Sequence, residues 1–126
     1  MLDISSIRLT VSFIDPELDE EDKDQETQNL LRQMRELDEI ENVERLVDFY
    51  IPDNSKSITA KALAGATAIV KSENTKKVWS FLTERLNRKQ IEMSLEAADG
   101  RKINLKVRNQ EEFKLVMQEA QEFIKV

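Results

Sequence analysis

Residues 90–107 constrain the fold most, because two alternating runs flank an Asp-Gly pair. In residues 90–97 every second side chain is apolar, and residues 101–107 repeat this pattern. The apolar positions are Ile91, Met93, Leu95 and Ala97 in the first run, and Ile103, Leu105 and Val107 in the second. Two half-buried strands joined by a tight turn explain both runs.

The length of that turn follows from the two faces of the hairpin. A two-residue turn would set Glu96 opposite Ile103 and mix polar with apolar side chains. A three-residue loop over 98–100 aligns the faces, pairing Leu95 with Ile103 and Met93 with Leu105 inside, and Glu96 with Lys102 and Glu92 with Lys106 outside. Gly100 then takes the left-handed position that such loops need. We therefore predict an antiparallel hairpin with this register.

Four further segments have clear periodicity. Residues 7–13 alternate as a half-buried strand, and residues 43–49 read as another strand, which Pro52 ends. Helical spacing predicts a helix at about 24–37, with an earlier start left open, and a second helix at 73–88. A last helix follows Asn109, with Glu112 placed as in a capping box. The expected buried stripes of these helices are Leu30, Leu31, Met34 and Leu37; Val78, Trp79, Leu82 and Leu86; and Phe113, Val116, Met117, Ala120 and Ile124.

The segment ITAKALAGATAIV at 58–70 is the ambiguous one. Its even positions 60–68 are all Ala, which is depleted in strands and is the best helix former. Ile58, Ala62, Ala66 and Ile69 would share one helical stripe. We therefore predict a small helix that packs closely against a neighbour, and if the segment proves exposed it becomes the first place to seek a partner surface.

These elements predict one α+β domain spanning residues 1–126. The first three form a βαβ unit with a right-handed crossover, and a helix pair, the hairpin and a C-terminal helix follow. The expected architecture is a ferredoxin-like mixed four-stranded sheet with helices mainly on one face. An exposed sheet edge could support a homo-oligomer, although the sequence does not say which edge is free.

Composition excludes several classes of function. The chain has no Cys and no His, so thiolate nucleophiles, Cys/His zinc sites and imidazole catalysis are absent. A net charge of −6 argues against nucleic-acid and anionic-membrane partners. The longest low-charge run, 58–70, is shorter than the roughly 20 residues that span a bilayer, and no secretion signal is evident. We expect a cytoplasmic protein.

No motif supports catalysis, a cofactor or a metal site. The acidic run Asp15–Glu26 lacks the glycine and the ligand spacing of a calcium loop, which leaves a solvated helix start. Ser55-Lys56-Ser57 could form a Ser–Lys pair only in a desolvating pocket, which nothing indicates. Arg101, Lys102, Lys106 and Arg108 lie near Glu92 and Glu96, which favours mutual neutralisation over a nucleic-acid surface. We predict that the protein is not an enzyme and has no catalytic, cofactor-binding or metal-binding residues.

The layout resembles the effector-associated constant component family, small accessory proteins of bacterial conflict and defence systems. The likeness lies in an opening strand before an acidic helix, then VERLVDFYIP with ITAKALAGATAIV, the helix VWSFLTERL, and the hairpin EAADGRKINLKV. The resemblance implies a non-catalytic adaptor that binds a separately encoded effector, such as a peptidase or its regulatory ATPase. The alternative is an ACT-like domain that senses a small ligand, which would need a pocket with convergent polar groups.

Overall fold

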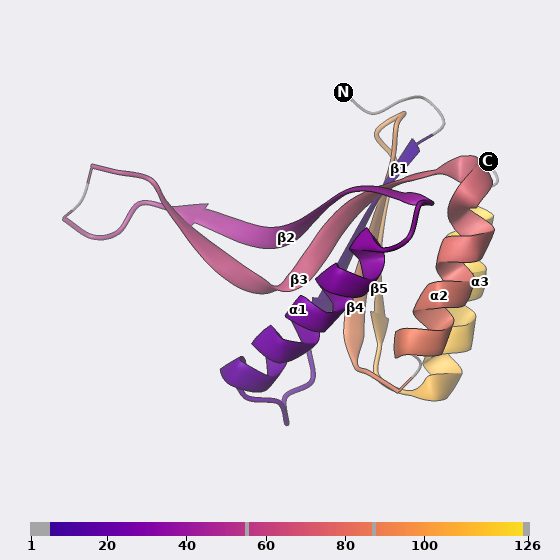
Figure 1. Cartoon of the computed structure of the whole chain (residues 1–126), viewed down its shortest axis with the longest axis horizontal. Helices are drawn as coiled ribbons and strands as arrows, with labels where there is room; N and C mark the ends of the chain where they lie inside the picture. Colours follow the sequence, from indigo (N-terminus) through magenta and orange to yellow (C-terminus); the bar gives the residue numbers. More distant parts are fainter. Residues whose placement is uncertain (1–5, 55, 87, 125–126) are drawn as a thin grey trace.

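The computed structural model describes residues 6–54, 56–86 and 88–124. Within these ranges, five strands form one sheet, and three α-helices accompany it (Figure 1). The strands are β1 Ser6–Phe13, β2 Ile40–Tyr50, β3 Thr59–Lys71, β4 Ile91–Ala97 and β5 Lys102–Val107. The helices are α1 Glu20–Arg35, α2 Thr75–Leu86 and α3 Gln110–Ile124, and the short 3-10 helix η1 Ser72–Asn74 precedes α2.

The sheet has the strand order β2-β3-β1-β4-β5, and every neighbouring pair is antiparallel. The α+β class is thus confirmed, whereas a mixed four-stranded sheet was wrong in strand number and direction. β1 and β2 run the same way, as the predicted βαβ unit requires, but β3 lies between them. The unit is therefore split by a strand that we predicted to be a helix.

Segment 58–70 forms most of β3 and not a helix. Local propensity favoured a helix, but β3 occupies the gap between β1 and β2 and pairs with both. Its small residues pack within the sheet: Ala66 and Ala68 are buried on the side that faces the helices. Gly65 lies so close to β1 that an added Cβ would come within 2.6 Å of the Val11 carbonyl oxygen. Tertiary pairing overrode the propensity of alanine.

The hairpin of β4 and β5 matches its predicted register at every position. Leu95 pairs with Ile103 and Met93 with Leu105, and the outer-face ion pairs Lys102–Glu96 and Lys106–Glu92 measure 3.5 and 3.8 Å. The Ala97 N–H donates to the Arg101 carbonyl, which closes the three-residue loop, and Gly100 has φ +95°.

The core lies between one face of the sheet and the three helices. β4, and β1 from Ile7 onward, alternate, with Ile7, Leu9, Val11 and Phe13 buried beside Ile91, Met93, Leu95 and Ala97. The predicted helical stripes are buried, except that Leu37 and Ile124 are half-buried at the margin. α1 takes the earlier start that the sequence left open, because Asp19 caps it by accepting a hydrogen bond from the Asp22 N–H at 2.7 Å.

Helix α3 has a modified version of the predicted capping box. Asn109 accepts from the Glu112 N–H at 2.9 Å, but the Glu112 carboxylate reaches back to the Arg108 N–H, one residue before the expected donor. The far face of the sheet is largely polar, and no helix of the described residues covers it. Thr10 and Thr67 share a hydrogen bond of 3.2 Å there.

Candidate functional site

A two-stranded arm projects from the body of the molecule (Figure 1). The pairing of β1 with β3 ends at Ser12–Gly65, whereas β2 and β3 stay paired out to Tyr50–Thr59. We call residues 46–54 and 56–64 the arm. A ribbon of two strands is marginally stable on its own, so its root in the five-stranded sheet holds it in place.

Local sequence explains where the arm begins and ends. The ladder shifts register between Arg45 and Val47, at the point where Gly65 passes close to β1. Such irregularities bend and twist a strand pair. At the far end Pro52 ends β2, and Asn54 has φ +64°, a left-handed conformation that suits Asn in a turn.

One face of the arm is entirely apolar. Val47 pairs with Ala62 and Phe49 with Ala60, and directly opposite residues share a face. Ile51 and Ile58 follow the last pair and extend this alternation. The larger side chains are strongly exposed: Ile58 72%, Phe49 66%, Ile51 63% and Val47 38%. We call Val47, Phe49, Ile51, Ile58, Ala60 and Ala62 the apolar face; Asp48, Tyr50, Thr59 and Lys61 occupy the opposite side.

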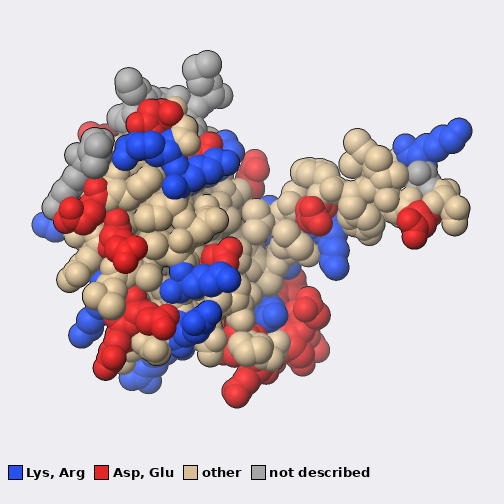
Figure 2. Space-filling view, turned by 180° about the vertical axis from the view of Figure 1, so that it is seen from behind, with Lys and Arg blue, Asp and Glu red and all other residues tan. Residues whose placement is uncertain are grey.

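The exposure of this face is unusual for a strand pair. Antiparallel sheets commonly bury an apolar face and leave a polar face in water. On the arm, no described helix or strand covers the apolar face. Figure 2 shows the contrast, with charges of both signs interspersed over the body and a largely uncharged arm. Contiguous exposed apolar surface of this kind marks interaction sites.

The root of the arm borders a groove of about 500 Å³. It is lined by Ser12 and Phe13 at the end of β1, by Glu20, Lys23 and Asp24 of α1, and by Arg45, Leu46 and residues 61–64 of the arm. Arg45 ties these parts together, because it pairs with Asp24 at 2.5 Å and its Nε donates to the Leu63 carbonyl at 3.0 Å. The groove lies where β1 would continue if it were longer.

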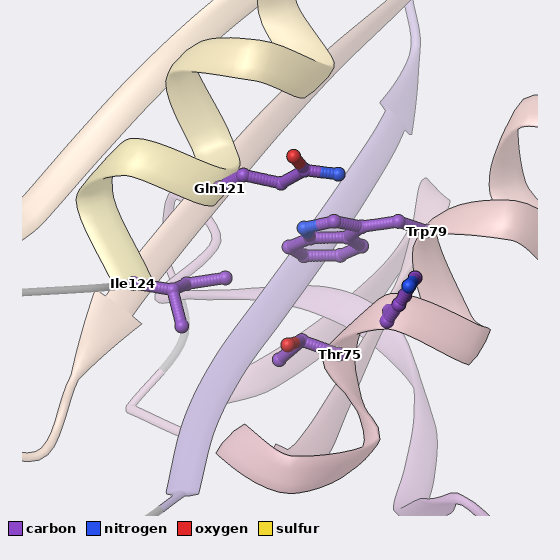
Figure 3. A pocket seen from close by; sticks show the side chains of 5 residues that line it. Thr75, Trp79, Gln121 and Ile124 are labelled. Atoms are coloured by element: carbon purple, nitrogen blue, oxygen red, sulfur yellow. The ribbon is translucent and has the colours of Figure 1, made fainter.

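A second hollow, of about 290 Å³, lies between the start of α2 and the end of α3 (Figure 3). Thr75, Lys76, Trp79, Gln121 and Ile124 line it. The Trp79 side chain is nearly fully buried, and its indole Nε1 has no acceptor among the described residues. In Figure 3 the Trp79 indole points from α2 towards α3, with Gln121 above it, Thr75 below it and Ile124 to one side. A buried N–H without an acceptor calls for an explanation, such as a bound water or ligand.

The other segments weighed from the sequence do not converge on one site. The acidic run surrounds the start of α1, and no three acidic side chains of the described residues are grouped to hold a metal ion. The basic residues of the hairpin are largely paired, and Arg101 contacts Asp99 at 2.8 Å and the Phe123 ring at 4.9 Å. Ser55 lies outside the described residues, and Lys56 is exposed at the arm's tip. Within the described part of the chain, no helix is long and apolar enough to cross a membrane.

Sequence reasoning missed the arm for an identifiable reason. The alternation of Val43, Val47 and Phe49 was visible, but alternation does not say whether a helix covers the apolar side. The one available signal was length. The two runs on either side of Pro52, which form β2 and β3, are each longer than β1, so β1 cannot pair along the whole of either one. We expected segment 58–70 to be the first place to seek a partner surface if it proved exposed. Its first half is exposed on the arm, while its second half is buried in the sheet.

No family model, curated protein or solved structure matches this chain at a significant level.

Proposed function

We propose that this protein is a non-catalytic adaptor, and that the apolar face of the arm is its docking surface for another protein. The carrying observation is the exposure of Phe49, Ile51 and Ile58 on one side of a ribbon, where no described element covers them. Apolar residues at the centre of an interface supply most of its binding energy. An arm held away from the body can reach into a groove of its partner.

The class of partner comes from the sequence resemblance alone. The four segments that resemble the effector-associated constant component family suggest a cytoplasmic accessory of a bacterial defence system. Its partner would then be a separately encoded effector, such as a peptidase or its regulatory ATPase. The mixed charges of the body support a protein partner in preference to nucleic acid, because they form no basic track on the face that Figure 2 shows.

The test compares three forms of the full chain as bait in the native host. These are the wild type, the double variant Phe49→Ser/Ile51→Ser, and Leu115→Ser as the control. Leu115 is 60% exposed on α3, so its substitution removes a comparable exposed side chain away from the arm. A captured protein is then purified and its affinity for each form is measured by calorimetry.

We expect the double variant to bind at least about tenfold more weakly, because truncating an interface anchor costs upward of about 1 kcal/mol. Leu115→Ser should bind as the wild type does. Equal affinities of all three forms would remove the arm from the interface. Purified partners that bind none of the forms would refute the adaptor function itself.

A second candidate is the ligand-sensing domain, which the Trp79 hollow favours. The strands and α-helices from β1 to β4 follow the order β-α-β-β-α-β, as in ferredoxin-like folds, and that layout suits an ACT-like sensor. The chain has a single Trp, so its fluorescence reports directly on the hollow. Saturable fluorescence changes together with thermal stabilisation by a metabolite or nucleotide would favour the sensor, and their absence across a broad panel would reject it.

A further inference from the structure

The hollow between the start of α2 and the end of α3 contains a hydrogen-bond donor that no described residue answers. The Trp79 side chain is only 3% exposed, and its indole Nε1 is buried without an acceptor. In Figure 3 the indole extends from α2 into the space among the lining residues, and its nitrogen lies at the edge turned towards α3. An indole N–H can only donate, so its burial here calls for an acceptor from outside the described chain.

Lys76 adds a positive charge to the same hollow, and that charge is also unanswered. No carboxylate of the described residues lies within ion-pair distance of Lys76, and none of the five lining residues is acidic. Its neighbour Lys77, in contrast, pairs with Glu39 at 3.5 Å and does not line the hollow. The hollow therefore presents two donors, one of them charged, that no described acceptor satisfies.

The other lining residues set the shape and the polarity of a ligand. The Thr75 hydroxyl donates to the Ser72 carbonyl at 2.8 Å, so its proton is already used. Gln121 is exposed, and its side chain makes no hydrogen bond within the described ranges, so its carboxamide can rotate and admit an acceptor to the indole edge. Ile124 and the ring of Trp79 supply apolar surface beside the donors.

We propose that this hollow binds a small organic acid, in which a carboxylate is carried on a compact apolar body. The carboxylate accepts a hydrogen bond from the Trp79 N–H and faces the Lys76 ammonium, while the body lies against the indole ring and Ile124. A volume of about 290 Å³ suits a molecule of about ten non-hydrogen atoms. A neutral ligand would leave the charge of Lys76 unanswered, and a bare inorganic anion would leave the apolar wall in water.

This proposal deepens the sensor candidate and rests on it, because it names the class of ligand that the sensor would detect. A bound acid contacts α2 through Lys76 and Trp79, and α3 through Gln121 and Ile124, so it joins the two helices. A ligand that binds only the folded state raises its stability. Saturation with the acid should therefore raise the melting temperature of the chain.

The test follows the indole N–H by NMR, because the chain has a single Trp and therefore one indole cross-peak. The probes are phenylacetate, its neutral amide phenylacetamide, and acetate, which keeps the charge without the apolar body. We expect phenylacetate to shift the cross-peak saturably, with a dissociation constant of about 1 mM. Phenylacetamide and acetate should bind at least about threefold more weakly, since each lacks one half of the match.

Two neighbouring lysines provide a matched pair of variants, and both side chains are exposed, so neither substitution disturbs the core. Lys76→Gln should weaken the binding of phenylacetate about two- to fivefold, as expected for the loss of an exposed charge contact. Lys77→Gln removes the same charge from the same turn of α2 but not from the hollow, so it should bind as the wild type does. Equal weakening in both variants would refute the role of Lys76.

The absence of a saturable shift with phenylacetate would overturn the proposal, and so would equal affinity for phenylacetamide. The sensor candidate fails on a different result. If a neutral metabolite shifted the Trp79 cross-peak while none of the acids did, the sensor would stand and the acid would be wrong. If no member of the panel bound, both would be wrong. The capture experiment with the arm variants does not involve this hollow, so its outcome leaves the acid site untouched.

Discussion

Gly65 offers the sharpest test of how the arm joins the body. A Cβ at this position would lie 2.6 Å from the Val11 carbonyl oxygen, and 3.1 and 3.2 Å from the Oγ and Cα of Ser12. Two of these atoms belong to the backbone of β1, which is paired on both sides, so they cannot rotate away. Gly65→Ala must therefore separate β1 from β3 near the root of the arm.

The magnitude follows from two opposing effects. Forcing an extra carbon into a packed site costs about 1–3 kcal/mol. Replacing Gly by Ala returns about 0.4–1 kcal/mol, because the unfolded chain has fewer conformations to lose. The net loss should be about 1–2 kcal/mol of unfolding free energy, or roughly 3–10 °C in melting temperature for a chain of this size.

The assay is urea denaturation followed by circular dichroism, with thermal melting alongside. Gly100 provides a matched control, since it has φ +95° and a Cβ added there would meet no other atom within 4 Å. There Asn should be tolerated better than Ala, because Asn adopts left-handed φ more readily. At position 65 the order should reverse, since Asn is larger. A Gly65→Ala variant as stable as the wild type would refute the steric argument.

Two further predictions concern the helix and hairpin in the second half of the chain. Asn109→Ala should lower the unfolding free energy by about 1 kcal/mol in urea denaturation, because it removes the acceptor for the Glu112 N–H, and Asn109→Asp should largely retain it. The backbone N–H of Arg101, and then its side chain, hold the pKa of Asp99 below its ordinary value. That contribution to stability is present above the ordinary pKa and is lost as pH falls below about 4, through the lowered value. An NMR titration should show the Asp99 pKa rising in Arg101→Met, and an unchanged pKa would contradict the contribution of the side chain.

Local alternation in the sequence was enough to predict the β4–β5 hairpin, down to its register. Both strands bury one face, so only one loop length aligns Leu95 with Ile103 and Glu96 with Lys102. The same holds for β1 and for the stripes of α2 and α3, whose periodicity is complete within each segment. The type and the buried face of these elements could be predicted from the sequence, because the hydrophobic period and the turn residues within each segment agree.

Segment 58–70 and the arm needed the tertiary structure. Five alanines favour a helix in isolation, and only the open place between β1 and β2 makes a strand the better state. Alternation in β2 predicted a strand, but whether Phe49 is buried depends on where β1 ends and how far α1 reaches. Those are properties of other segments. The sequence by itself therefore determined the elements whose pattern is complete within one segment. The packing between distant segments decided which surface remained open to a partner.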